Sequence, residues 1–249
     1  MTPSRLSPSF EELAAASLRD LEANPYPGRG IVLGRSSDGA RLLQLYWIMG
    51  RSANSRNRRF VAEGARLRTE PLDPSRVEQP ELVIYTAMDV LDEHHVVSNG
   101  NHTDAIVQAL LAGQDYRAAL RHCAHEHDAP HHTPRIAGGM RTREGDAWLG
   151  IVKADPGDAR RSLRQYFEFE ALPPGWGWGI TTYAGDGDPL PSYGGEPHPL
   201  PLAGAPEALL QAFWGRLHPE NRVAMALKTV DPATGAATVS IVNARDTAA

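Results

Sequence analysis

Short apolar runs rich in β-branched and aromatic residues recur along the chain, separated by turn-forming residues. Runs of this length and composition predict strands. We expect strands at residues 30–34, 41–48, 60–69, 147–152, 178–183, 222–230 and 237–242, and a further β-like or mixed segment from 81 to 85. Ser36-Ser37-Asp38-Gly39 is typical of a hairpin turn between the first two strands.

Other segments carry apolar residues three and four positions apart, which is the spacing of a helix face. They span residues 103–112, 116–124 and 206–217, and Ser9 could cap a further short helix near the start. Predicted strands on both sides therefore enclose a pair of helices. This order favours a single α+β domain with sheets packed under helices. The stretch 184–204 is rich in Pro and Gly and is expected to be a long surface loop.

One stretch, from His94 to Asp104, reads as a strand that stops at a Gly-containing turn and opens a helix. Such a turn brings polar side chains and free backbone N–H groups to one point, which suits an anion or an oxygen-rich ligand. The alternative is that Thr103 or Asp104 only caps the helix. The local sequence leaves both interpretations open.

Composition narrows the class of protein. With 41% hydrophobic and 22% charged residues, the 249-residue chain is typical of a soluble globular protein, long enough to bury a proper core. A net charge of −5 gives no reason to expect general nucleic-acid or membrane-surface binding. The single cysteine, Cys123, excludes an internal disulfide framework. With no signal-like start and no run of about 18 apolar residues, we expect a cytoplasmic protein.

A loop at residues 50–59 holds four arginines among small hydrogen-bonding residues: Arg51, Arg56, Arg58 and Arg59. Guanidinium groups donate paired hydrogen bonds to phosphate or carboxylate, so an anion clamp is one interpretation. A solvated charged loop is the other. Neither a GxGxxG nor a GxxxxGK[ST] motif is present, so the sequence does not indicate nucleotide binding by those routes.

A second polar stretch follows the predicted helical pair and contains five histidines around two acids: His122, His125, Glu126, His127, Asp128, His131 and His132. The spacing permits metal ligation, but it lacks the HExxH pattern. We favour acid–base chemistry by a histidine or by Glu126 over metal binding, and we expect no metal. Immediately afterwards, Pro134 holds the chain extended, which would fix the directions of Thr133 and Arg135. A purely structural turn is the alternative there.

Four blocks together resemble the archaeal-type inosine monophosphate (IMP) cyclohydrolase family. They are GRGIVLGRS at 28–36, VVSNGNHTD at 96–104, TPRIA at 133–137 and AWLGIVKAD at 147–155. The resemblance implies a four-layer αββα sandwich similar to that of N-terminal-nucleophile hydrolases. It also divides the chain into an N-terminal extension, residues 1–27, and a cyclohydrolase-like domain, residues 28–249.

The activity implied by this resemblance is closure of 5-formamidoimidazole-4-carboxamide ribotide to IMP with loss of water, in purine biosynthesis. The substrate is a small purine ribotide, and the chemistry requires no cofactor. Its 5′-phosphate needs a cationic clamp, for which we predict Arg51 and Arg56. The groups predicted to transfer protons are Tyr85, Glu126 and His102. Base and ribose would be positioned by a set of polar residues: Asn99, Asn101, Thr103, Asp104, Thr133 and Arg135.

Two features differ from the family pattern. The extension makes a nucleophile at a mature N-terminus improbable unless the extension is cleaved, and Pro27-Gly28-Arg29 offers no Ser, Thr or Cys. The 184–204 loop lengthens the C-terminal part. Two alternatives therefore stay open beside the cyclohydrolase: an amidohydrolase on the same fold, and a non-catalytic purine-nucleotide-binding protein. Whether the chain forms a homo-oligomer also stays open.

Overall fold

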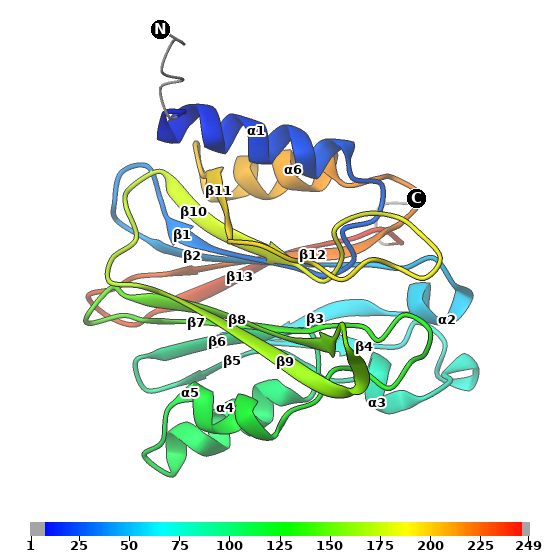
Figure 1. Cartoon of the computed structure of the whole chain (residues 1–249). Helices are drawn as coiled ribbons and strands as arrows, with labels where there is room; N and C mark the ends of the chain where they lie inside the picture. The colour runs from blue at the N-terminus through cyan, green and yellow to red at the C-terminus, as the bar shows by residue number, and fades with distance from the viewer. Residues whose placement is uncertain (1–7, 246–249) are drawn as a thin grey trace, which may run out of the picture.

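A computed structural model describes residues 8–245, and two antiparallel sheets form its centre. The first sheet has the strand order β11-β10-β1-β2-β12-β13 and the second has the order β3-β4-β5-β6-β7-β8-β9. Figure 1 shows the two sheets stacked face to face, with helices on both outer faces. The molecule thus has helices on both outer faces of two stacked antiparallel sheets, the αββα layer order that the family resemblance implied.

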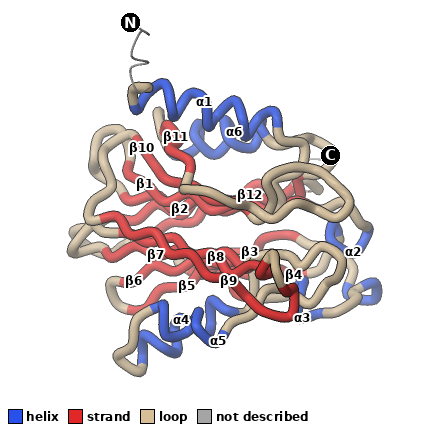
Figure 2. The backbone as a smooth tube through the Cα atoms, viewed as in Figure 1, coloured by secondary structure: helices blue, strands red, loops and turns tan. Residues whose placement is uncertain are grey.

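The strands of the first sheet come from both ends of the described chain. They are β1 (Gly30–Arg35), β2 (Leu42–Met49), β10 (Trp176–Thr181), β11 (His198–Pro201), β12 (Arg222–Val230) and β13 (Ala237–Asn243). The second sheet is contiguous in sequence: β3 (Arg59–Glu63), β4 (Arg66–Glu70), β5 (Thr86–Leu91), β6 (His94–Ser98), β7 (Arg135–Arg141), β8 (Ala147–Asp155) and β9 (Asp158–Phe169). Figure 2 separates these strands from the helical layers by colour.

Two helices cover each outer face. α1 (Phe10–Ala23) and α6 (Pro206–Arg216) lie over the first sheet, and α4 (His102–Leu111) and α5 (Tyr116–His122) lie over the second. A capping box between Ser9 and Glu12 begins α1, as expected for that segment. Three short helical turns complete the elements: α2 (Ala53–Arg56), η1 (Pro74–Arg76) and α3 (Pro80–Val83).

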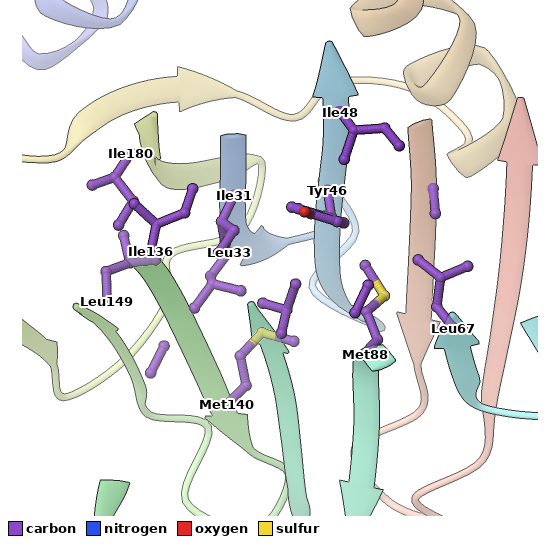
Figure 3. Close-up of a cluster of buried hydrophobic side chains, with 14 of the residues drawn as sticks. Ile31, Leu33, Tyr46, Ile48, Leu67, Met88, Ile136, Met140, Leu149 and Ile180 are labelled. Atoms are coloured by element: carbon purple, nitrogen blue, oxygen red, sulfur yellow. The ribbon is translucent and has the colours of Figure 1, made fainter. Parts of the chain in front are cut away.

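The main core lies between the sheets, because alternate residues of each strand face the other sheet. Leu33 and Tyr46 of the first sheet and Met88 and Leu149 of the second are buried there (Figure 3). A second cluster packs the first sheet against α1 and α6, and a third packs the second sheet against α4 and α5. Burial on both faces explains why β1 and β2 read as continuous apolar runs.

Four expectations about elements were wrong. Residues 60–69 form a hairpin of two strands, β3 and β4, because the chain turns at residues 64 and 65. The segment 81–85 begins in helix α3, which Pro80 starts, and β5 begins only at residue 86. Residues 198–201 pair with β10 as β11, inside the expected loop. The cap of α4 is Asn101, without a side-chain cap bond, so neither Thr103 nor Asp104 is the N-cap.

Candidate functional site

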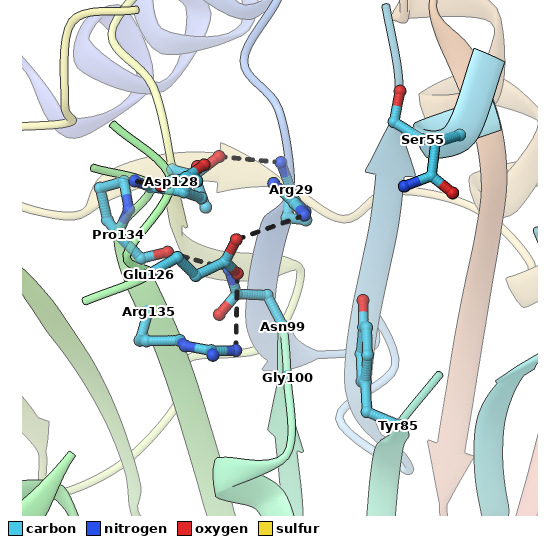
Figure 4. Close-up of polar contacts among 12 residues, drawn as sticks. Arg29, Ser55, Tyr85, Asn99, Gly100, Glu126, Asp128, Pro134 and Arg135 are labelled. Carbon is cyan, nitrogen blue, oxygen red and sulfur yellow. Dashed lines mark hydrogen bonds and ion pairs between the residues drawn. The ribbon is translucent and has the colours of Figure 1, made fainter. Parts of the chain in front are cut away.

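Charged side chains from both sheets meet at one end of the sandwich. Arg29 immediately precedes β1, Arg135 is the first residue of β7, and Glu126 lies in the loop between α5 and β7. Glu126 Oε2 lies 4.0 Å from an Arg29 amino nitrogen, and Glu126 Oε1 lies 3.5 Å from Arg135 Nη1. In Figure 4, dashed lines join Glu126 to both guanidinium groups. The side chain of Glu126 is only 2% exposed, so the carboxylate is held between two cations away from water.

The three side chains keep unused hydrogen-bonding capacity. Arg29 Nε, Glu126 Oε1 and Arg135 Nη1 are all buried, and none has a hydrogen-bond partner among the residues that the structure describes. Glu126 Oε1 and Arg135 Nη1 face each other only in their 3.5 Å ion pair. Buried polar atoms in folded proteins are nearly always paired, and leaving one unpaired costs about 1–3 kcal/mol. A cluster with three such atoms therefore has the character of a site prepared for a polar ligand.

Positive charge is in excess around this carboxylate. Arg58, just before β3, is 2% exposed and is close enough to Arg29 that burial and this neighbour lower its pKa. Arg58 is held by the carbonyls of Ser55 and Met49, and it forms no ion pair with a carboxylate of residues 8–245. Three arginines therefore surround Glu126, a balance that favours an anionic ligand.

Burial raises the pKa of Glu126, while Arg29 and Arg135 act in the opposite direction. The net shift moves this carboxyl group toward the pH range in which a group can both accept and return a proton. Perturbed acids of this kind, buried beside specific charge partners, are characteristic of catalytic sites.

The turn after β6 explains how Arg135 is held in place. A Cβ atom at Gly100 would lie 1.8 Å from Arg135 Nη1, so only glycine leaves room for this guanidinium. Asn99 binds the backbone on both sides of Arg135: its amide nitrogen donates to the Pro134 carbonyl at 2.9 Å, and its amide oxygen accepts from the Ile136 N–H at 2.8 Å. The sequence motif thus aligns the first residue of β7.

His102, at the start of α4, supports the same strand. Its Nε2 donates to the Ile136 carbonyl at 3.0 Å, so in the neutral imidazole Nδ1 is the unprotonated nitrogen. Burial and the charge of Arg135 lower the pKa of His102 to about 3. This histidine therefore carries no proton to donate as an imidazolium near neutral pH.

Hydroxyl groups border the charged cluster on two sides. Thr133 Oγ1 donates to Asp128 and accepts from the hydroxyl of Tyr183, each at 2.5 Å. On the other side, the hydroxyls of Tyr46 and Tyr85 share a hydrogen bond of 2.8 Å between the two sheets. Burial and Tyr85 raise the pKa of Tyr46 well above its usual value, so Tyr46 stays protonated.

The sequence model of the family described as IMP cyclohydrolase-like protein matches residues 26–235, which include the whole charged cluster. The chain belongs to this family. The match begins after α1 and ends before β13. Every residue of the cluster around Glu126 therefore lies in the part of the chain that family members have in common.

Similar proteins include three archaeal proteins named IMP cyclohydrolase. The one from Methanopyrus kandleri is 36% identical over 131 residues, 51% of this chain and 63% of the relative. That from Methanosphaera stadtmanae is 30% identical over 148 residues, 54% and 70% of the two chains. That from Methanothrix thermoacetophila is 32% identical over 164 residues, 64% and 74%. The match to the first thus covers less than two thirds of that relative's length.

Of the residues predicted from the sequence, the structure brings Glu126, Arg135 and Asn99 together, with His102 and Thr133 beside them. Tyr85 lies at the same end of the sandwich, paired with Tyr46. Thr103 is buried, and its hydroxyl binds Ser98 at 2.5 Å within the turn. Asn101 and Asp104 are exposed at the start of α4.

The two arginines predicted for phosphate binding lie near α2 and have protein partners. Arg51 Nη1 lies 2.5 Å from Asp186 Oδ1 in the 184–204 loop, and its guanidinium lies over the Tyr26 ring. Arg56 donates from Nε to the Gly50 carbonyl at 2.8 Å and from Nη2 to Asn221 at 3.2 Å. Either arginine could bind an anion only through an N–H group that has no protein partner, or after giving up one of these protein partners to the anion.

Sequence reasoning missed Arg29 as a site residue, and it named Arg58 only as one of four arginines of a possible anion clamp. Arg29 lies in the first block of the family resemblance, between Gly28 and Gly30, and that position was the available signal. Arg58 was indistinguishable from Arg51, Arg56 and Arg59, because burial of one arginine in a run depends on distant strands. Within residues 8–245, no three His, Cys, Asp or Glu side chains are placed to hold a metal ion. No helix in this range is long and apolar enough to span a membrane.

Proposed function

We propose that the protein is an IMP cyclohydrolase, closing 5-formamidoimidazole-4-carboxamide ribotide to IMP with loss of water in purine biosynthesis. Membership of the family and relatives that bear this name support the proposal. The observation in this chain that carries it is the buried Glu126 between Arg29 and Arg135, with hydrogen-bonding atoms of all three unused.

The excess of positive charge suits a ribotide, which carries a phosphate. The anion is attracted to this end of the sandwich by the three arginines around Glu126, which are Arg29, Arg58 and Arg135. Its phosphate is held at α2 by Arg51 and Arg56. For Arg51 this requires exchange of Asp186 for the phosphate. The exposed pair Asn101 and Asp104 then contacts the ribose, and Thr133 contacts the ribose or base.

Ring closure needs two proton movements. The carboxamide nitrogen attacks the formyl carbon, and one N–H proton moves to the formyl oxygen to give a carbinolamine. A second N–H proton then moves to the hydroxyl group, the C–O bond breaks and water leaves. Glu126 accepts each proton from nitrogen and returns it to oxygen, so one carboxyl group serves both steps. General acid–base catalysis of this kind contributes roughly 10²–10⁴ in rate.

The neighbouring groups stabilise and position the reacting atoms. Negative charge develops on the formyl oxygen during attack, and the unused donors of Arg29 and Arg135 can bind it. Tyr85, supported by Tyr46, donates a hydrogen bond to the substrate and relays a proton. His102 and Asn99 act through β7, by fixing Arg135, and Thr103 fixes the turn.

The proposal also includes a relationship of this fold to a larger class of enzymes. Two antiparallel sheets between two helical layers support a likeness to the N-terminal-nucleophile hydrolases. The mechanism above uses no terminal nucleophile, no metal and no cofactor. We place the protein in the cytoplasm, acting on a small-molecule ribotide and not on nucleic acid.

Purified protein is tested by supplying the formamido-ribotide and following IMP formation by absorbance and chromatography. We expect turnover in the wild type, a loss of roughly 10²–10⁴ in kcat for Glu126→Gln, and a smaller loss for Tyr85→Phe. Tight binding of the ribotide without conversion would instead indicate a non-catalytic nucleotide-binding protein. Loss of the N-terminal segment by autoproteolysis, read by mass, would indicate an amidohydrolase.

A further inference from the structure

A cavity of about 480 Å³ lies on the opposite face of the first sheet from the charged cluster, beneath α1. Its walls come from α1 and the turn after it, from β10, and from the segment between β10 and β11. Aromatic and polar side chains are prominent among them: Asp20, Asn24, Trp47, Tyr183, Tyr193 and His198. This volume is within the range of small-molecule sites, roughly 300–1,000 Å³.

Trp47 lines this cavity and carries an unused hydrogen-bond donor. Its indole is 1% exposed, and its Nε1 atom has no hydrogen-bond partner in the described part of the chain. A buried tryptophan N–H usually has an acceptor. The indole extends from β2 across β1, where a Cβ atom at Gly30 would lie 1.9 Å from the ring. Gly30 is paired with Thr181 of β10, which also lines the cavity, so the missing side chain opens the path for the indole.

The charge of the walls is opposite to that of the charged cluster. Among the described residues that line the cavity there is no lysine or arginine, whereas Asp20 contributes a carboxylate. His198 is half-buried and lies edge-on to Tyr193, and burial lowers its pKa. The amine of Lys153 lies behind this wall, where it donates to the Tyr193 carbonyl at 2.8 Å. The lining itself is acidic and therefore favours an uncharged ligand with N–H donors.

We propose that this cavity binds an uncharged planar heteroaromatic molecule of the purine-base class. An acceptor nitrogen or carbonyl of the ring takes the Trp47 N–H, an N–H of the ring donates toward Asp20, and the aromatic walls cover its faces. The site is distinct from the ribotide site because its described lining includes none of Arg29, Arg58, Glu126 and Arg135. Tyr183 is shared: its ring lines the cavity, and its hydroxyl reaches Thr133.

Isothermal titration of the full chain with hypoxanthine and with adenine tests this site. Gly185 lines the cavity, and a Cβ atom there meets nothing within 4 Å, so Gly185→Phe adds a bulky ring at the cavity wall without a clash at Cβ. Gly215, on α6, has the same open surroundings away from the cavity, and Gly215→Phe is the control. We expect saturable binding that Gly185→Phe abolishes and Gly215→Phe preserves. Trp47→Phe should weaken binding about tenfold by removing one donor.

Arg29→Ala separates this inference from the proposed enzymatic function. It removes a cation of the charged cluster, so ribotide binding should fall while base binding stays unchanged. Loss of base binding in Arg29→Ala, with retention in Gly185→Phe, would place the base in the ribotide site and overturn the inference. Absence of saturable binding by either base in the wild type would overturn it as well, whatever the cyclohydrolase assay gives.

Discussion

At the scale of single residues, the site depends on a glycine that leaves room for a cation. Gly100 has no side chain where the Arg135 guanidinium lies, so Gly100→Ala forces Arg135 away from Glu126. A displacement of about 1 Å at a catalytic group can cost about 100-fold in rate. We expect a kcat loss of that size in the cyclohydrolase assay. Gly215→Ala, which meets open space on α6, should retain full activity.

Glu126 gives the second prediction at this scale. Because the carboxylate must be ionised to accept the first proton, kcat/KM should fall as pH drops through the pKa of Glu126. Burial raises that pKa above the usual 4.5, so the fall of kcat/KM on the acid side of the pH profile should be centred above pH 4.5. Arg135 lowers the pKa, and Arg135→Gln should shift this fall to higher pH in the residual activity. A fall that stays in place would show that another group controls the proton transfer.

At the scale of elements, Asn99 joins the end of β6 to the start of β7 through two side-chain hydrogen bonds. Asn99→Ala leaves a buried carbonyl and a buried N–H without these partners, at a cost of about 2–3 kcal/mol in the free energy of unfolding. Urea titration measures this cost. Asn101 is exposed and makes no cap bond, so Asn101→Ala should change stability by less than about 0.5 kcal/mol. Equal losses in both variants would contradict the role assigned to Asn99.

The elements also show which parts of the fold could be predicted from the sequence. Apolar runs located the central strands β1, β2, β8 and β12 because burial on both faces leaves a strong local signal. Turn positions were missed within 60–69, and β11 was missed because its pairing with β10 is invisible locally. Likewise the turn after β6 indicated Asn99, and the segment around Pro134 indicated Arg135. Arg29 and Arg58 join the site only when two sheets stack. Convergence between distant strands has no local signature.

At the scale of the whole molecule, the two sheets enclose a second polar group of residues, farther from the site. Lys228 of β12 is fully buried, and its amine donates to the Asp89 carbonyl at 3.4 Å. Gln44, its neighbour on β2, donates to the His95 carbonyl of the facing sheet. Both ring nitrogens of His95 are buried without a hydrogen-bond partner among the described residues. Stacking of the sheets therefore encloses groups whose charged forms are disfavoured.

This burial predicts how stability depends on pH. Burial lowers the pKa of Lys228 from 10.5 to about 7 and, with the charge of Lys228, lowers that of His95 from 6.5 to about 4. Between pH 7 and 10.5 the unfolded chain binds a proton at Lys228 that the folded chain does not. Stability therefore rises with pH in this window, by up to about 1.4 kcal/mol per unit from this group. Below pH 6.5 the same reasoning for His95 makes stability fall as the pH falls toward 4.

Lys228→Met separates the two effects, because it removes the buried amine and keeps an unbranched apolar side chain between the sheets. Urea unfolding at half-unit steps from pH 5 to 9.5 should show the alkaline rise of the wild type reduced in the variant. The acid loss should persist, since His95 remains. At neutral pH the variant should be at least as stable as the wild type, because it no longer buries an amine with one long hydrogen bond. Parallel wild-type and variant curves above pH 7 would show that Lys228 does not link the stacking of the sheets to pH.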